Sequence, residues 1–243
     1  ELECELIPVL VYMSMQGVPV DLDAAEQFNK DLKVRESLLL KEFKHLDIWS
    51  PQQLGKYCES LGLKVPLTDK GNYSVAKDFL NHCEHPQVKK IQEARSINRL
   101  RKVFIEDIIL NQNHNGRIHA DFRQTASDEG GTRSGRLSSS NPNMQQVPKR
   151  SDIGKRIRSL YIAEPGRLWC KADYSSQEPR LQVHYALLGQ FGRPLPGAEE
   201  ARLAFANGQK LYTFFENATG LPYDTCKMLC LGISYGMGLT KTV

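Results

Sequence analysis

A polar stretch from residue 116 to 150, GRIHADFRQTASDEGGTRSGRLSSSNPNMQQVPKR, sets the strongest limit on the fold of this 243-residue chain. It holds too few apolar residues to form a hydrophobic core and is dense in Gly, Ser, Asn, Gln and Arg. A long polar segment inside a compact domain is usually either disordered or functional. Gly135, Asn141, Pro142 and Asn143 favour turns, which suits a rigid loop laid along a ligand. Nucleic-acid contact and a plain surface loop fit this chemistry equally well.

The composition, 40% hydrophobic and 25% charged, is that of an ordinary soluble globular protein. No apolar stretch approaches the roughly 20 residues that span a bilayer, and the N-terminus lacks a signal-peptide pattern, so we expect a cytoplasmic protein. The six cysteines form no Cys-x-x-Cys pair, which predicts buried thiols rather than zinc ligands or disulfides. The first residue is Glu1 rather than methionine, which fits a fragment of a longer protein.

Residues 1 to about 112 have a helical pattern. ELIPVLVYMSMQ reads as an apolar helix ended by Gly17, and a short extended segment and a second helix over 23–45 follow. Ser50 is a good N-cap before Pro51 at the first position of the next helix. LTDKGNYS reads as a hairpin or turn, and helices resume near 74 and near 86.

The last of these helices is expected to have an apolar back and a basic front. Ile97, Leu100, Phe104 and Ile108 fall on one stripe when residues are placed 100° apart, and a basic group falls on the opposite side. That group is Arg95, Arg99 and Lys102. Such a face can bind phosphates with release of counterions, although a merely solvated helix face explains the same pattern.

Three motifs occur in order along the chain: GRLSSSNPNMQQVP, then ADYSSQEPRL, then KMLCLGISYGMG. In this order and at these spacings they resemble the family A DNA polymerases, of the polymerase I type, with variants closest to phage members. The N-terminal segments around residues 5–21, 50–63 and 116–124 are similar to the start of the family's polymerase domain.

The resemblance implies an α+β fold, a fragment of a right-hand polymerase. A helical thumb with a preceding connector would occupy residues 1–115. A duplex-contacting loop and the first part of an antiparallel palm would occupy 116–190, and the start of helical fingers 191–243. It also implies a location in the cytoplasm of a bacterial or phage-infected cell.

Asp173 ends an apolar run that reads as a strand, and a polar turn and a helix follow it. In the family this position is the first catalytic aspartate, and the carbonyl of Tyr174 is a backbone metal ligand. The resemblance therefore implies two Mg²⁺ ions in the complete site, where one acts on the attacking 3′-oxygen and one on the leaving pyrophosphate. The plainer alternative is that Asp173 caps the following helix.

Further positions match nucleotide-binding residues of the family. Glu178 matches a glutamate that leaves no room for a ribose 2′-hydroxyl, although its charge also suits a helix N-terminus. Lys227 matches a triphosphate-binding lysine, and Tyr235 an aromatic on the template side of the insertion site. Leu231 stands where many members have Phe or Tyr. A plain amphipathic core helix over 222–234, with Cys226 and Cys230 buried, is the alternative.

Two tyrosines depart from the family pattern. Tyr223 stands where an arginine usually contacts the γ-phosphate, and Tyr212 stands where a histidine lies near the phosphates. A tyrosine donates one hydrogen bond but adds no positive charge.

The polar stretch supplies the expected duplex contacts. Arg136 matches an arginine that reaches the minor groove of the primer-template duplex. Asn143, Gln145 and Arg150 match neighbouring duplex-contacting positions. Donors placed in the minor groove can test base-pair shape without reading sequence, because every pair presents acceptors there.

The family's second metal-binding aspartate lies in a His-Asp-Glu tract, and nothing in residues 1–243 matches it. We therefore expect this chain to bind primer-template DNA and deoxynucleoside triphosphates but to polymerise poorly alone. A second chain or a C-terminal segment would then complete the palm and fingers. The alternatives are a non-catalytic DNA-binding or processivity subunit derived from the family, which Tyr212 and Tyr223 favour, and an unrelated RNA-binding protein with a basic loop.

Overall fold

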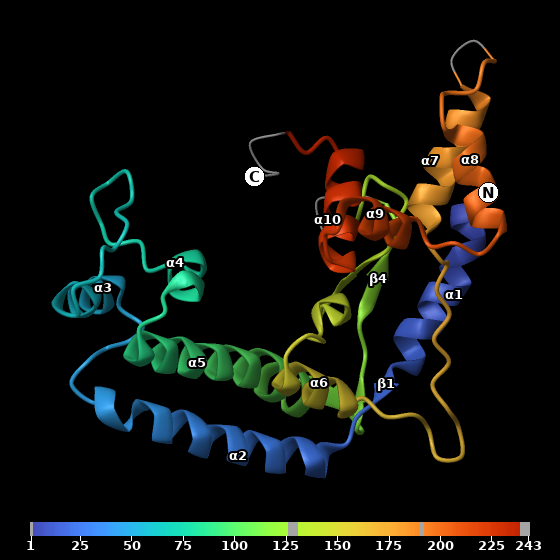
Figure 1. Ribbon diagram of the computed structural model, residues 1–243. Coiled ribbons are helices and arrows are strands. Elements are labelled where there is room, and N and C mark those ends of the chain that lie inside the picture. The colour runs from blue at the N-terminus through green and yellow to red at the C-terminus, as the bar shows by residue number, and fades with distance from the viewer. Residues whose placement is uncertain (1, 126–130, 190–191, 239–243) are drawn as a thin grey trace. The chain divides into compact units, whose positions relative to one another are not determined.

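The computed structural model describes residues 2–125, 131–189 and 192–238, and it divides into two compact units, Glu1–Trp169 and Cys170–Val243. The described part is mainly helical, with two small antiparallel sheets (Figure 1). None of its helices combines the length and the apolar character needed to cross a bilayer.

The first unit begins with α1 (Leu2–Gln16), which ends at Gly17 as the sequence predicts. The short strand β1 (Val18–Pro19) leads into α2 (Leu22–Leu40), where the side chain of Asp21 caps the helix by accepting from Ala24 N at 2.9 Å. A 3₁₀ turn, η1 (Lys41–Phe43), follows α2 directly. The predicted helix over 23–45 is thus confirmed as these two pieces.

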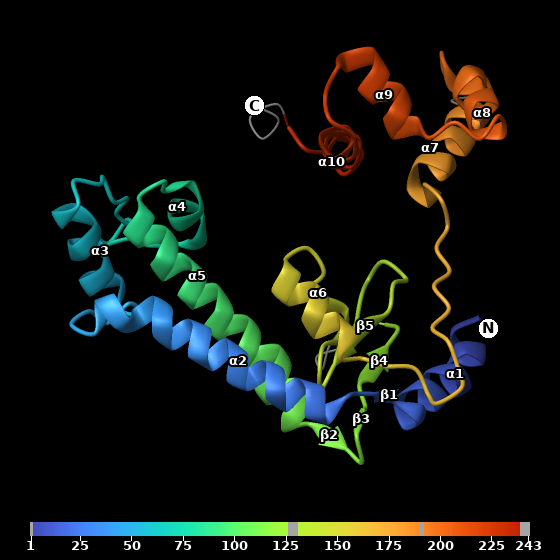
Figure 2. The same ribbon diagram turned by 60° about the horizontal axis from the view of Figure 1, so that its bottom comes forward.

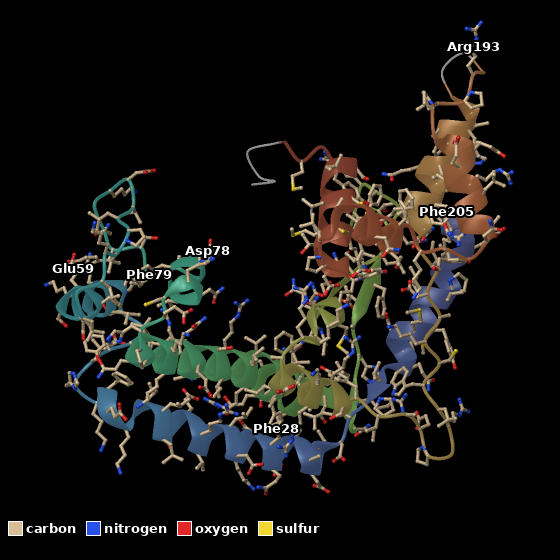
Figure 3. All side chains as sticks on the ribbon, viewed as in Figure 1. Phe28, Glu59, Asp78, Phe79, Arg193 and Phe205 are labelled. Carbon is tan, nitrogen blue, oxygen red and sulfur yellow. The ribbon has the colours of Figure 1, made fainter. Side chains whose placement is uncertain are left out.

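Next come two short helices around a hairpin-like turn. The N-cap of α3 (Pro51–Ser60) is Ser50, whose side chain accepts from Gln53 N, which confirms the predicted cap and the proline at the first helical position. An antiparallel bridge joins Leu67 and Tyr73, as the turn signal in LTDKGNYS predicts. The helix α4 (Lys77–His82) then leads to α5, and Phe79 of α4 (Figure 3) packs against a cluster that includes Leu54 and Ile91.

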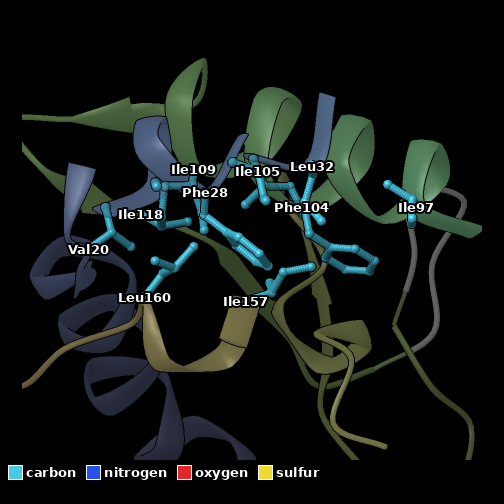
Figure 4. Close-up of a cluster of buried hydrophobic side chains, with 12 residues drawn as sticks. Val20, Phe28, Leu32, Ile97, Phe104, Ile105, Ile109, Ile118, Ile157 and Leu160 are labelled. Atoms are coloured by element: carbon cyan, nitrogen blue, oxygen red, sulfur yellow. The ribbon is translucent and has the colours of Figure 1, made fainter. Parts of the chain in front are cut away.

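The long element of this unit is α5 (Pro86–Leu100) together with η2 (Arg101–Leu110), which is wound as a π-helix. It packs along α2, as both views of the ribbon show (Figures 1 and 2). The main core lies between them, where Phe28, Ile105 and Ile157 are buried (Figure 4). Ile97, Phe104 and Ile108 are buried and Leu100 packs against the same cluster, so the predicted apolar stripe is confirmed.

Short strands carry the polar stretch. In the first sheet, β3 (Arg117–Ile118) lies between β1 and β2 (Asn113–His114) and pairs antiparallel with both. The second pairs β4 (Asp121–Arg123) with β5 (Ser138–Ser140), and Phe122 lies opposite Ser139. A 3₁₀ turn, η3 (Met144–Gln146), and α6 (Asp152–Ser159) follow. Residues 126–130 of the predicted loop lie outside the described residues.

The second unit is helical where it is described. Its helices are α7 (Gln177–Leu188), α8 (Ala198–Ala206), α9 (Leu211–Thr219) and α10 (Tyr223–Ser234). Helix α7 packs on α8, and α9 packs on α10. The predicted helix over 222–234 is confirmed by α10. Phe205 of α8 (Figure 3) lies under the guanidinium of Arg180 from α7, 4.6 Å from its Cζ.

Two sequence predictions are wrong. Cys4 and Cys170 are exposed rather than buried, whereas Cys58, Cys83 and Cys226 are buried and Cys230 is half-buried. The run before Asp173 is not a strand: residues 168–174 are irregular, and Leu168 and Trp169 are 95% and 62% exposed. The physical reason is that a strand needs a neighbour for its backbone hydrogen bonds, and no described strand pairs with this run.

Candidate functional site

In the first unit, the basic front of α5 borders a cavity of about 890 Å³. Arg95 and Arg99, one turn apart on α5, line it, as do Gln145 and Arg150 from the polar stretch. The structure thus brings together four residues that the sequence predicts separately. Lys102, Arg136 and Asn143 lie outside the lining, and Lys102 and Arg136 are exposed.

Sequence reasoning missed three further side chains around this cavity. Trp49, Lys149 and Arg158 also line it. Trp49 lies in the turn before α3, and the guanidinium of Arg95 lies over its ring with Cζ 5.6 Å from the centroid. The sequence offers one signal that could have found Trp49, because it is an aromatic residue directly before the Ser50–Pro51 helix start.

The pKa of Arg95 is lowered from its usual value by burial. Its Nη1 atom is fully buried without a hydrogen-bond partner among the described residues. A buried donor without a partner has lost its hydrogen bonds to water and gained none in return. A hydrogen bond to an anionic oxygen would offset that desolvation free energy.

Arg101, which starts η2, is a basic residue with a structural role. It is 5% exposed, and it forms ion pairs with Glu106 at 2.7 Å and with Glu36 at 3.2 Å. Asn29 donates to Glu106 at 3.2 Å and Lys33 pairs with it at 2.7 Å, so the carboxylate has three donors. These bonds join α2 to the α5–η2 element and hold the helix that carries Arg95 and Arg99.

Within the polar stretch, two predicted duplex contacts are engaged locally. The side-chain oxygen of Asn143 accepts from Gln145 N at 3.1 Å and so caps η3. Gln145 Nε2 donates to Leu137 O at 2.9 Å. The carbonyl of Arg136 accepts from the hydroxyl of Thr132, which closes the loop before β5. Asn143 keeps its amide donors and Gln145 its amide oxygen for further contacts.

In the second unit, Asp173 and Tyr174 are exposed and lie three and two residues before the N-cap of α7, which is Ser176. Ser176 has a φ of 53°, and no side chain caps this helix. The alternative that Asp173 is a helix cap is therefore wrong. Within the part of the chain that the structure describes, no hydrogen bond or ion pair engages the Asp173 carboxylate, so it is available for a ligand.

The residues predicted to bind nucleotide come from both ends of this unit. Tyr235, the C-cap of α10, donates its hydroxyl to Glu178 Oε1 at 2.8 Å, so the second and third sequence motifs meet. Lys227, Leu231 and Tyr235 follow one another at four-residue intervals along one face of α10. Lys227 is exposed, and Leu231 is half-buried.

The two tyrosines that depart from the family pattern contact each other. The rings of Tyr212 and Tyr223 meet edge to face with centroids 5.7 Å apart. Tyr212 is buried, and burial together with Cys230, the charge of Glu178 and Tyr223 raises its pKa, so its hydroxyl stays protonated. The pair places a neutral aromatic cluster beside Glu178.

Asp173 and Tyr174 can supply part of the ligand set of a magnesium ion. Among the described residues, no group of three or more His, Cys, Asp or Glu side chains is arranged to hold a metal. Asp173 offers an exposed carboxylate and Tyr174 a backbone carbonyl. Mg²⁺ prefers oxygen ligands of this kind and is usually bound by one or two carboxylates plus water and phosphate.

Comparison with known proteins gives a consistent result. The model of DNA polymerase family A matches residues 22–241. The DNA-directed DNA polymerase of Pseudomonas phage M6 is 32% identical over 265 residues, which cover 99% of this chain and 39% of the phage protein. The thermostable DNA polymerase I of Thermus aquaticus is 31% identical, over 98% of this chain and 29% of that protein.

Among solved structures, the POL domain of Pol1 from M. smegmatis, in complex with DNA primer-template and dNTP, superposes with a TM-score of 0.70. It is 25% identical, and the match covers 97% of this chain and 42% of that one. The chain therefore spans less than half the length of the relatives that it matches.

Proposed function

The chain belongs to DNA polymerase family A, and we propose that it is part of a DNA-directed DNA polymerase that transfers deoxynucleotides to a primer 3′-hydroxyl as the template directs. The observation that carries the proposal is the hydrogen bond from Tyr235 to Glu178, because it joins the two motifs expected to surround the incoming nucleotide. The primer-template and dNTP bound to the M. smegmatis relative support the same substrates here.

In this proposal the thumb and its connector occupy residues 1–115, the duplex-contacting loop and first part of the palm 116–190, and the start of the fingers 191–243. The cavity along α5 supports duplex binding, since Arg95, Arg99, Gln145 and Arg150 line it. Lys102, Arg136 and Asn143 extend the contacts to the phosphates and the minor groove. Such contacts are largely independent of sequence.

In the second unit, each predicted site residue is assigned one role. The Asp173 carboxylate and the Tyr174 carbonyl would hold Mg²⁺, which when bound stabilises charge on the transferring phosphoryl group. Lys227 attracts the triphosphate, and Leu231 and Tyr235 offer apolar surface to the base pair on the same face of α10. Glu178, fixed by Tyr235, fills the space beside the sugar C2′ and so selects deoxynucleotides.

The alternative is a DNA-binding or processivity subunit without catalysis, which one observation favours. Tyr212 and Tyr223 form a neutral pair where the family has positive or titratable groups, so Lys227 lacks their support for the triphosphate. Weaker binding of triphosphate would follow, because each added cation at a phosphate contributes a charge-assisted hydrogen bond.

Primer extension tests the proposal. The 243-residue chain is assayed for duplex binding and extension, alone and in a chimera that joins to Val243 the sequence that follows the matched segment in the phage M6 polymerase. Duplex binding by the chain with extension by the chimera supports the polymerase. A chimera that folds and binds duplex, yet extends no primer at any triphosphate concentration, supports the non-catalytic subunit. Absence of duplex binding by the chain contradicts both.

A further inference from the structure

The charged side chains that line the cavity along α5 are all basic. Five basic side chains line it, and among the described residues no carboxylate does. They are Arg95, Arg99, Lys149, Arg150 and Arg158. Positive charge gathered in a concave surface focuses the field and raises the local concentration of anions. This excess within one cavity contrasts with the chain's mild net charge of +4.

An aromatic ring borders the same cavity, and the backbone that carries it is held in place. The N–H of Trp49 donates to Asp47 Oδ1 at 2.9 Å, its neighbour Ile48 is buried, and Ser50 caps α3 on the other side. The Trp49 side chain nevertheless remains 46% exposed, with Arg95 over its ring. An exposed indole on a fixed backbone has only its own side-chain torsions to order when a ligand covers it, which keeps the entropy cost small.

One atom of the guanidinium beside Trp49 is buried without a partner in the described part of the chain. Arg95 Nη1 has no hydrogen-bond acceptor among the described residues although it is out of contact with solvent. Arg95 also lines the cavity, so a phosphate oxygen there can offer an acceptor to its guanidinium. The volume of about 890 Å³ is within the range of pockets that hold small organic ligands, so a whole nucleotide can enter.

We propose that this cavity is a binding site for an unpaired nucleotide of a DNA strand, in which the base stacks on Trp49 and the phosphates contact Arg95, Arg99 and Arg150. Positive grooves with aromatic platforms are the usual means of holding single strands, since every base has a π-face. Bases inside a duplex are already stacked on their neighbours, so their faces are closed to Trp49. The site thus adds single-strand binding to the duplex binding of the proposed function, on which the choice of DNA as ligand rests.

The chain offers a direct optical test, because Trp49 and Trp169 are its two tryptophans. In a Trp169→Phe background the fluorescence reports Trp49 alone. This chain is titrated with oligothymidylate, with an abasic sugar-phosphate oligomer of equal length, and with long poly(dA)·poly(dT) duplex that has few ends. Quenching by oligothymidylate that exceeds quenching by the other two ligands is expected.

Affinity measurements by anisotropy of labelled DNA complete the test. Trp49→Leu should weaken oligothymidylate binding about 5- to 150-fold, the range for loss of one stacked base, and Trp49→Phe should weaken it less. Tyr12→Leu, which removes an exposed aromatic from α1, is the matched control and should leave single-strand affinity unchanged. Arg95→Gln should lower the salt slope on single strands by about 0.7.

Equal quenching by oligothymidylate and by duplex would overturn the inference, as would equal losses of single-strand affinity in Trp49→Leu and Tyr12→Leu. So would a folded Trp49→Phe protein that binds oligothymidylate no better than Trp49→Leu does. These results leave the proposed function intact as long as the chain binds duplex. Loss of all DNA binding by the unmodified chain contradicts the proposed function itself.

Discussion

The hydroxyl of Tyr235 lies 2.8 Å from Oε1 of Glu178, which joins the C-terminal end of α10 to the first turn of α7. Fifty-seven residues separate the two in sequence. The bond fixes the direction of the Glu178 carboxylate, since a hydrogen bond to a charged acceptor is short and directional. A carboxylate that fills space beside a sugar needs a fixed position in order to exclude one extra hydroxyl group.

This relationship predicts how the sugar is selected. In the chimera, Glu178→Ala should raise incorporation of ribonucleotides relative to deoxynucleotides by at least about tenfold, because the space beside C2′ is opened. Tyr235→Phe keeps the ring and removes this hydrogen bond, so it should raise the ratio less. Single-turnover incorporation of both nucleotides measures the ratio. An unchanged ratio in Glu178→Ala would exclude the proposed role of this residue.

A second prediction concerns Asp173. In the chimera, Asp173→Ala should lower single-turnover incorporation by more than about 100-fold and leave duplex affinity nearly the same, since a metal ligand acts mainly on charge that develops in the transition state. Asp224→Ala, which removes an exposed carboxylate in the first turn of α10, is the control. Near-normal incorporation by Asp173→Ala would contradict the assignment.

The third prediction is about salt. Arg99→Ala should reduce the slope of log affinity against log salt concentration for duplex DNA by about 0.9, the value for one phosphate contact. Arg35, which pairs with Glu93 and does not line the cavity, provides the control variant Arg35→Ala. Fluorescence anisotropy between 50 and about 200 mM salt measures both slopes. Equal slopes in the two variants would mean that the α5 face is merely solvated.

A fourth prediction follows from the ion pairs of Glu106. Burial raises the pKa of this carboxyl, but hydrogen bonds from Lys33 and Asn29 and the charge of Arg101 lower it further than burial raises it, so it lies below the ordinary 4.5. The unfolded chain therefore binds the proton more readily. The stabilisation is present above the ordinary pKa and is lost as pH falls through the folded value.

Glu106→Gln should thus lower the free energy of unfolding by about 1 to 3 kcal/mol at pH 7, and the difference from the unmodified chain should shrink below about pH 4.5. Urea unfolding at several pH values measures this. Glu93→Gln, which removes an exposed partner of Arg35, should change the free energy by less than about 1 kcal/mol throughout. If the difference in free energy of unfolding between Glu106→Gln and the unmodified chain grows as the pH falls, the lowered pKa of Glu106 does not explain it.

The fifth prediction tests the turn between α1 and β1. Gly17 has a φ of 59°, and a Cβ atom there would lie 2.8 Å from the carbonyl oxygen of Ile118 and from the ring of His119. Gly17→Ala should therefore destabilise the chain by more than about 1 kcal/mol. Gly62→Ala is the matched control, because that glycine also has a positive φ but open space around it. Thermal melting compares the two.

Local signals in the sequence predicted the helices well. Ser50 with Pro51, and Gly17 after an apolar run, mark ends that backbone chemistry alone decides, and the stripe of Ile97, Phe104 and Ile108 shows where α5 and η2 bury their apolar side. The run before Asp173 could not be predicted in this way, since a strand depends on a partner distant in sequence.

The same distinction applies to the candidate site. The basic residues of α5 could be found from their spacing, but Trp49 comes to Arg95 across 46 residues through the fold of α3 and α4. Arg101 looks like its basic neighbours in sequence. It is buried because Glu36 and Glu106 stand opposite it, and no periodicity in the sequence reveals those partners.

The π-helical winding of η2 has a consequence for how this segment can vary in length. In a π-helix the hydrogen bonds join residues five apart, so each hydrogen-bonded ring contains one more residue than in an α-helix. The ten residues of η2 therefore span a shorter length along the helix axis than they would in an α-helix. Removing one residue between Lys102 and Leu110 would favour ordinary α-winding and rotate everything that follows, including Ile108 and Ile109, relative to α2. Point substitutions at the exposed positions Lys102 and Val103 cause no such rotation. Natural variation here should therefore appear as substitutions at a constant number of residues.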